Sequence, residues 1–336
     1  MSNLTAAAHI LGTGFYVPPK VVTNDDLAKL FDTSDEWIQQ RSGIKERRYS
    51  DENDPPAVMG AKASRMAIAD AGLEVGDIDG IILGTLSPDH TFPGSSVIVQ
   101  RLLGLEGIAA MDVRNQCTGL LYSLATADAW IRMGLAKNIL VIGTEVHSTG
   151  IDFHNDGRDV TVLFGDGAAA MVVGPTPDPS QGLMCHRLHA DGRGMESLWL
   201  PYPASGHFPH RAPLSMYEDK SVYPQMEGRK VFKFACKKLP EVIMEVCEAT
   251  GTGLDDIDVL VPHQANMRIN EMVAKMLKFP PEKVVHNIQK YGNTTAASVG
   301  IALHEARKDG RITEGSTVML AAFGSGFTWA ASLVQF

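Results

Sequence analysis

MDVRNQCTGLLY, from Met111 to Tyr122, joins a short apolar run at 107–110 to a helical pattern of apolar residues. The run is typical of a buried strand, and the spacing from Leu120 to Ile131 predicts a buried helix. Cys117 therefore lies where a strand ends and a helix begins. Backbone N–H groups at such a helix start favour a thiolate and could bind an oxyanion. The alternative is that Cys117 is a small apolar core residue, since free cysteine is often buried.

Composition limits the class of protein. The 336 residues, 44% of them hydrophobic, suffice for one large core or two fused half-domains. A net charge of −9 argues against a nucleic-acid partner but leaves room for a local basic patch. Four widely spaced cysteines without a Cys-x-x-Cys pair indicate neither a metal site nor a disulfide framework. We expect a cytoplasmic protein, because the sequence has no signal-peptide pattern and no apolar run near the roughly 18–20 residues of a membrane span.

The second half of the chain repeats the first. Asp77–Ile82 reads DIDGII, and Asp256–Val261 reads DIDVLV, 179 residues later. The apolar strand pattern Ile139–Gly143 recurs at the same offset as Val318–Ala322. A helical pattern at 296–306 corresponds to the helix that follows the cysteine. Helices alternate with buried strands in both halves, so each half is predicted to be a mostly parallel sheet flanked by helices, an α/β fold.

The Pro- and Gly-rich segment 174–180 is the best linker candidate. We therefore divide the chain into an N-terminal half at 1–177 and a C-terminal half at 178–336. Ligands in such sheets bind at the carboxyl ends of strands. Cys117 is predicted at such an end in the first half, and His263 in the second.

Three further segments add to this organisation. Residues 162–170 read as two strands around a Gly-Asp-Gly turn. Residues 193–228 break the alternating pattern and are rich in Pro, Gly, His and aromatic residues, which predicts a cap-like excursion over a site. Trp37 and Arg41 are one helical turn apart and share a face, either as a binding pair or as a core Trp beside a surface Arg.

Two more residues are candidates for chemistry. His263 lies in VPHQANMRI (261–269), and Asn293 lies in KYGNTTAAS (290–298) at a turn that enters a helix. Taken singly, the histidine could be a hydrogen-bonded core or cap residue, and the asparagine an ordinary turn or N-cap residue. The repeat, however, would bring both to one crevice with Cys117.

These motifs, in this order and over nearly the whole chain, resemble the β-ketoacyl-acyl-carrier-protein synthase III family of thiolase-fold condensing enzymes. The resemblance implies two duplicated halves layered as αβαβα. The segments that carry it are Asp32–Ile38, Met111–Tyr122, Phe164–Ala168, Val261–Asn266, Gly292–Thr294 and Phe323–Trp329.

The resemblance implies a two-step reaction that begins fatty acid synthesis. Cys117 would take an acyl group from acyl-CoA. His263 and Asn293 would then donate hydrogen bonds to the thioester oxygen of malonyl-acyl-carrier protein, stabilising the enolate formed as CO₂ leaves. The backbone N–H groups of Cys117 and Ser325 would form the oxyanion hole, although the family usually has Gly at the second position. No metal and no cofactor beyond these substrates is implied.

The resemblance also implies residues that bind CoA. Trp37, Arg41 and Arg158 would surround the adenine and phosphates, where aromatic stacking and guanidinium groups suit a nucleotide. Gly228 and Asn266 would contact the pantetheine arm.

Partner surfaces follow in the same way. Lys233, Arg268 and Lys275 match the basic patch that docks the acidic carrier protein, the alternative being a solvated charged face. Met276 stands where the family often has a further Lys. Phe92 matches the residue that reaches across a homodimer to end the partner's acyl pocket, the alternative being ordinary packing.

Several reactions stay open. Arg114–Gln116 before Cys117 and Thr118 after it look more like specialised relatives that make alkylquinolone precursors or polyketide starters. The acyl chain and the choice between malonyl-acyl-carrier protein and malonyl-CoA are therefore undecided. A degradative thiolase would need a second cysteine near the C-terminus, yet none follows Cys247. A non-decarboxylating enzyme would need a carboxylate base, and a non-catalytic acyl-CoA or carrier-protein binding module would not need the Cys/His/Asn set.

Overall fold

The computed structural model describes residues 7–336, which form two large β-sheets with helices between and around them, and two small two-stranded sheets. The first sheet has the strand order β1 (Ala8–Tyr16), β7 (Gly167–Pro175), β6 (Ile139–Glu145), β4 (Gly80–Gly84) and β5 (Ala109–Val113). The second has the order β8 (Gly182–Ala190), β13 (Thr328–Gln335), β12 (Thr317–Gly324) and β11 (Val259–Pro262).

Both sheets follow one topology. In each sheet the strand that comes first in the chain lies at one edge, followed by the strand that comes last, the strand before it and then the second strand of that sheet. The fifth position of the second sheet is reduced to a single parallel bridge between Leu260 and Val284. The linker expected at 174–180 lies around the connection from β7 to β8.

The sheets are mixed, so the prediction of mostly parallel sheets was wrong. β4 pairs in parallel with β5 and β6, and β11 with β12, whereas the other pairs are antiparallel. β13 begins four residues after β12 ends, and a parallel connection needs a crossover of roughly a dozen residues or more. The expected strand at 162–164 is also absent; the short α6 (Arg158–Thr161) and one bridge between Phe164 and Asn293 take its place.

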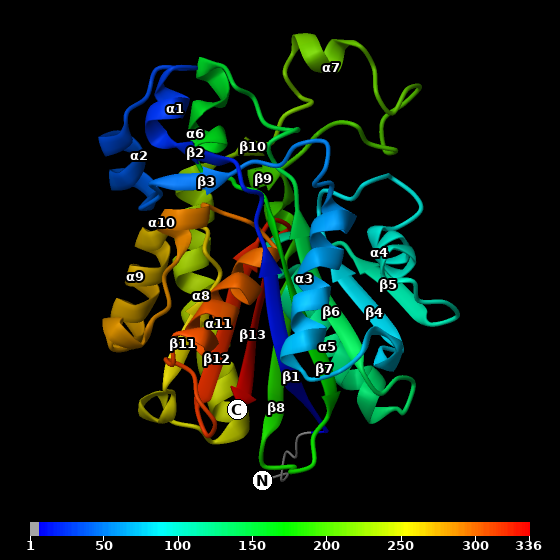
Figure 1. Cartoon of the computed structure of the whole chain (residues 1–336). Helices are drawn as coiled ribbons and strands as arrows, with labels where there is room; N and C mark the ends of the chain where they lie inside the picture. Colours follow the sequence, from blue (N-terminus) through cyan, green and yellow to red (C-terminus); the bar gives the residue numbers. More distant parts are fainter. Residues whose placement is uncertain (1–6) are drawn as a thin grey trace.

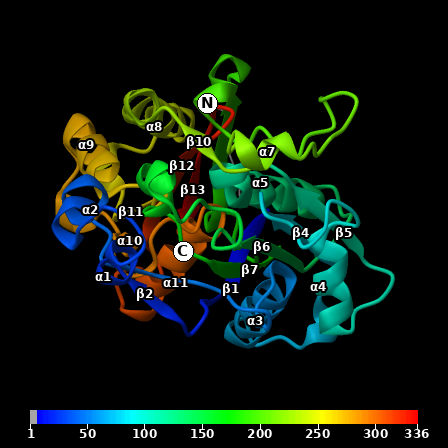
Figure 2. The same cartoon turned by 90° about the horizontal axis from the view of Figure 1, so that it is seen from above.

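Five layers result, as Figures 1 and 2 show. The helices α3 (Pro56–Asp70) and α4 (Ser95–Leu103) cover the outer face of the first sheet, α5 (Gly119–Arg132) and α11 (Ala297–Lys308) lie between the sheets, and α8 (Gly228–Thr250) and α9 (Met267–Leu277) flank the second. The middle helices are apolar on several faces because both sheets pack on them: Leu120, Leu124 and Leu303 are fully buried in one cluster with residues from both sheets. The predicted α/β fold with αβαβα layering is confirmed.

Short elements surround one end of the sheets. They are β2 (Val21–Thr23), α1 (Asn24–Ala28), α2 (Asp35–Ser42), β3 (Glu46–Arg48) and α10 (Ile288–Tyr291). The excursion at 193–228 contains β9 (Leu198–Trp199), α7 (Ser215–Glu218) and β10 (Gln225–Met226). It projects at the end of the molecule opposite the C-terminal residue (Figure 1). No helix within residues 7–336 is long and apolar enough to cross a membrane.

Candidate active site

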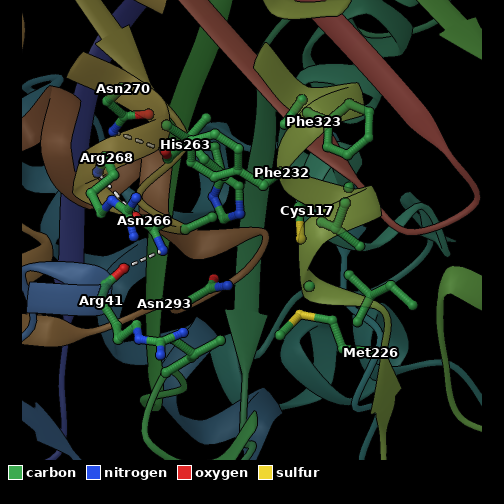
Figure 3. Close-up of a pocket in the computed structure, with 18 of the residues that line it drawn as sticks. Arg41, Cys117, Met226, Phe232, His263, Asn266, Arg268, Asn270, Asn293 and Phe323 are labelled. Carbon is green, nitrogen blue, oxygen red and sulfur yellow. Dashed lines mark hydrogen bonds between the residues drawn. The ribbon is translucent and has the colours of Figure 1, made fainter. Parts of the chain in front are cut away.

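A cavity of about 660 Å³ opens between the two halves near the carboxyl ends of their strands. Cys117, His263 and Asn293 all line it. In the view of Figure 3, His263 and Asn293 lie on one side of the cavity, and Cys117 lies on the other. Three candidates separated by up to 176 residues are thus brought to one site.

Cys117 lies in a single 3₁₀ turn, Gln116–Thr118, that leads into α5. The turn begins at Gln116 with a left-handed φ of 45°. Gly324, at the end of β12, packs directly on the cysteine, and a Cβ there would stand 2.8 Å from the Cys117 Cβ. Glycine therefore lets the second sheet approach the nucleophile. Backbone N–H groups of Ser325 and Cys117 donate to the sulfur, which is where an oxyanion hole would need its donors.

The thiol is protonated at neutral pH, contrary to the thiolate expected from the helix start. Burial, with a smaller contribution from the nearby carboxylate of Glu145, raises the pKa of Cys117 to about 12 against the opposing effect of the two N–H groups. Cys117 is only 6% exposed, so desolvation outweighs the helix N-terminus. Loss of its proton must therefore accompany attack on a substrate.

His263 follows β11 directly and is arranged as a neutral donor. Its Nδ1 lies 2.5 Å from Ser298 Oγ, and the backbone N–H of Gln264 donates to the same oxygen. The serine hydroxyl is thereby free to donate its hydrogen to Nδ1, and in that tautomer the imidazole carries its own hydrogen on Nε2. That Nε2 is buried and has no hydrogen-bond partner among residues 7–336. Burial and the neighbouring His147 lower the pKa of His263 to about 3.

Asn293 is held by its backbone and by one side-chain oxygen. Its N–H donates to Leu163 O at 2.8 Å, and its carbonyl accepts from Gly165 N–H at 3.1 Å. Its Oδ1 accepts from Thr295 N–H at 2.8 Å. The amide hydrogens of Nδ2 have no partner in the described part of the chain and remain available to a ligand in the cavity. The site thus offers two neutral donors, from His263 and Asn293, near one sulfur.

The residues expected to bind the nucleotide also lie close together. The Arg41 and Arg158 guanidinium groups lie 5.1 Å and 4.6 Å from the Trp37 ring centroid. Trp37 and Arg41 line the cavity, as do Gly228 and Asn266. The Asn266 side chain also caps α9 and donates to Arg41 O at 2.9 Å, so it joins α2 to α9 at the cavity rim.

The basic residues lie on the adjoining helices. Lys233 on α8 and Lys275 on α9 are exposed, and Arg268 both lines the cavity and lies 5.7 Å over the Phe232 ring. Phe92 is 80% exposed and does not line the cavity of its own chain. Of the basic candidates the structure therefore places only Arg268 at the cavity itself, with Lys233 and Lys275 on the same two helices, α8 and α9, and Phe92 away from its lining.

Several residues around the site were not predicted from the sequence. Glu145, at the end of β6, is buried, and burial raises its pKa to about 7. Its oxygens accept from Ser87 Oγ at 2.7 Å and from the N–H groups of Leu86 and Ser87. The only signal for it was an acid at the end of an apolar strand. His147, Ser298 and Arg229, which lines the cavity, had no signal beyond their neighbours in the motifs.

A metal site needs a cluster of ligating side chains. Among residues 7–336 no group of three or more His, Cys, Asp or Glu is placed to hold a metal ion.

A five-layer fold with a buried cysteine between two like sheets is that of the thiolase-like condensing acyltransferases. The model for 3-oxoacyl-[acyl-carrier-protein] synthase III matches residues 111–192, and that for the C-terminal part of the same enzymes matches 247–336. The chain belongs to this 3-oxoacyl-[acyl-carrier-protein] synthase III family.

Individual proteins similar to this chain support the same family assignment. The chain is 45% identical to the beta-ketoacyl-[acyl-carrier-protein] synthase III of Caldanaerobacter subterraneus subsp. tengcongensis, over 98% of each chain. The crystal structure of 3-oxoacyl-[acyl-carrier-protein] synthase III from Aquifex aeolicus is similar at a TM-score of 0.89 and 41% identity, covering 98% of this chain and 100% of that one. The priming beta-ketosynthase of the R1128 polyketide biosynthetic pathway is similar at 0.89 and 31%, covering 99% and 97%.

Proposed function

We propose that this condensing acyltransferase loads an acyl group from acyl-CoA onto Cys117 and condenses it with malonyl-acyl-carrier protein to β-ketoacyl-acyl-carrier protein. The observation that carries the proposal is the unpartnered Nε2 of His263, which shares a cavity with the Asn293 amide and the Cys117 sulfur.

In the first step the Cys117 sulfur attacks the acyl-CoA carbonyl. The N–H groups of Cys117 and Ser325 stabilise the oxyanion, and the bond to the CoA sulfur breaks as the thiol proton leaves with CoA. The raised pKa of Cys117 makes deprotonation a cost of this step. Trp37, Arg41 and Arg158 hold the adenine and phosphates, and Gly228 and Asn266 lie along the pantetheine.

In the second step the malonyl thioester binds beside the acyl-enzyme. The bond to its carboxylate breaks, and the electron pair forms an enolate whose oxygen accepts hydrogen bonds from His263 and Asn293. The enolate carbon then attacks the acyl carbonyl, and the Cys117 sulfur leaves and is protonated. Two neutral donors suit this step because decarboxylation itself supplies the carbanion. The reaction therefore needs no cofactor.

Other reactions fit the site less well. A thiolase needs a second cysteine, but Cys185, Cys236 and Cys247 pack in the cluster between α8 and the second sheet and do not line the cavity. A non-decarboxylating enzyme needs a free carboxylate, whereas Glu145 is occupied by several donors. A non-catalytic binding module would not require unpartnered donors opposite a sulfur.

A specialised synthase is the second candidate. Its support is the similarity to a priming beta-ketosynthase of a polyketide pathway and the Arg114–Gln116 segment before Cys117. We assign Lys233, Arg268 and Lys275 to carrier-protein docking, because all three lie on the helices that border the entrance. Phe92 is assigned to the acyl pocket of a partner in a cytoplasmic homodimer, since an aromatic side chain that is 80% exposed in one chain could be covered by another.

Acyl-CoA profiling tests the proposal. The protein is incubated with acetyl-, butyryl-, isobutyryl- or octanoyl-CoA, and then with malonyl-acyl-carrier protein or malonyl-CoA. Mass spectrometry is expected to find the acyl group on Cys117 and a β-ketoacyl product on the carrier protein. Preference for an octanoyl starter or for malonyl-CoA would favour the specialised synthase, and no adduct with any acyl-CoA would refute both.

A further inference from the structure

His147 is a buried imidazole that the proposed reaction does not use. It lies two residues beyond β6, is 6% exposed and does not line the cavity. Its backbone N–H donates to Asp166 Oδ1 at 2.7 Å, which fixes its position. Its ring stacks on Phe164 with centroids 4.3 Å apart, its Nε2 lies 2.6 Å from Thr295 Oγ1, and it lies near enough to His263 to lower the pKa of that residue.

Thr295 is the unusual partner in this pair. Its φ of 49° is in the left-handed region, which a β-branched residue rarely adopts. Such a conformation persists only where the surroundings hold it. Thr295 is fully buried, and His147 is the one hydrogen-bond partner of its hydroxyl among the described residues. The imidazole therefore stabilises a strained residue.

The strained residue in turn orients Asn293. Thr295 N–H donates to Asn293 Oδ1, so the position of that N–H determines which way the carboxamide faces. Phe164, the residue on which His147 stacks, forms the backbone bridge with Asn293. His147 thus contacts both segments that hold Asn293, one through a hydrogen bond and the other through ring stacking.

We propose that His147 is a positioning residue for condensation, which holds the turn at 293–295 so that the Asn293 amide faces the thioester oxygen. This inference rests on the proposed function, in which Asn293 serves the enolate and not the acyl transfer. Loss of the His147 contact should slow condensation and leave acylation of Cys117 unchanged. A role in stability alone would affect both steps together.

The kinetic test uses His147→Leu, which removes the hydrogen bond and keeps much of the volume, and His147→Gln, which keeps a donor. Acylation is followed by mass spectrometry in a single turnover, and condensation by product formation from preformed acyl-enzyme. Misplacement of a catalytic group by a fraction of an ångström predicts roughly a 10–30-fold loss in condensation for His147→Leu, with acylation within about twofold. His147→Gln should recover most of the loss.

His304 offers a matched control. It is also buried, lies 3.0 Å from a threonine hydroxyl (Thr13) and packs on a phenylalanine (Phe15), but it does not line the cavity. His304→Leu is expected to leave the ratio of the two rates unchanged. An equal loss in both steps for His147→Leu, or the same selective loss for His304→Leu, would overturn the inference.

A crystal structure of His147→Leu tests the positioning itself, whatever reaction the protein performs. The expected result is a shifted Thr295 and a rotated Asn293 carboxamide, and an unchanged Asn293 would overturn the inference. If His147→Leu does not fold, Thr295→Val removes the hydroxyl from the other side and should give the same selective loss. Absence of any acyl adduct in the wild-type protein would refute the proposed function, and the crystal structure would still decide the role of His147.

Discussion

Two turns of like backbone conformation, one in each half of the chain, carry different chemistry. Gln116 has a φ of 45° and Thr295 a φ of 49°, and they are 179 residues apart, the same offset that separates the first residues of β4 and β11. Each turn leads into one of the two helices between the sheets. In the first the next residue is Cys117; in the second it is Ala296, and the candidate catalytic residue is Asn293, two positions before the strained threonine.

The two turns show that the same backbone geometry can present different functional side chains. A non-glycine residue in a sparsely populated conformation costs about 1–3 kcal/mol, so each turn needs support. The first is held by the Thr118 hydroxyl, which lies 2.8 Å from Asn115 O and 2.9 Å from Thr328 Oγ1. The second is held by His147. We infer that the turn in the N-terminal half presents a nucleophile, Cys117. The turn in the C-terminal half presents a hydrogen-bond donor, Asn293, to developing negative charge.

The largest effect should come from the first turn. Cys117→Ser replaces the sulfur with a poorer nucleophile, and we expect acyl transfer to fall by at least roughly 10³-fold. Rapid quench with radiolabelled acetyl-CoA measures it. Cys247→Ser, a change at a buried cysteine beyond the part of α8 that lines the cavity, is the control and should acylate normally. Near-normal labelling of the Cys117→Ser protein would show that the first turn does not carry the nucleophile.

Substitution of the candidate histidine in the C-terminal half should slow the condensation step and not the acyl transfer. His263→Ala removes one of two donors to the enolate, which predicts roughly a 10²–10³-fold loss of decarboxylation, measured as ¹⁴CO₂ release from labelled malonyl-acyl-carrier protein. Acylation should stay within a few-fold of wild type. If CO₂ release is unaffected while acylation fails, the assignment of the two turns must be reversed.

A smaller effect is expected outside both turns. Trp37→Ala removes the ring that two guanidinium groups cover, and cation–π contacts of about 1–2 kcal/mol predict roughly a tenfold rise in KM for acyl-CoA. The rate constant at saturation should barely change. Trp130→Ala, at the far end of α5, is the control for loss of an indole. A fall in the saturated rate with unchanged KM would place Trp37 in the chemistry instead.

The smallest effect is a pH dependence of stability. Burial lowers the pKa of His147 to about 4, below its value of 6.5 in the unfolded chain. The unfolded chain therefore binds a proton that the fold excludes, so stability falls as the pH drops from about 6.5 towards 4. Between pH 7 and pH 4.5 His147→Leu should therefore lose less stability than wild type, measured by urea denaturation at both pH values. Equal losses would mean that His147 does not titrate in this range.

Much of the fold could be predicted because local hydrophobic patterns and the internal repeat indicate its helices and strands. The repeat of DIDGII as DIDVLV placed two equivalent strands, and both lie at equivalent positions of the two sheets. Cys117, His263 and Asn293 were found because each follows a recognisable strand or turn. Strand direction was predicted wrongly, because hydrophobic periodicity does not encode it and the antiparallel pairing of β12 and β13 follows from the short connection between them.

Other features depend on contacts between distant residues. The protonated state of Cys117 follows from burial and from Glu145 on another strand, neither of which a local motif contains. The pair of His147 and Thr295 joins residues 148 positions apart, with no periodic signal at either. Phe92 matched a motif, but it is 80% exposed and does not line the cavity, so its role stays a prediction.

The division of labour between the two turns is tested most directly by single-turnover mass spectrometry of Asn293→Ala, given acetyl-CoA and then malonyl-acyl-carrier protein. The account predicts that the acetyl group appears on Cys117 at the wild-type rate and then persists, because the enolate lacks one of its donors. Failure to acetylate, or loss of the acetyl group to product as fast as in wild type, would contradict it.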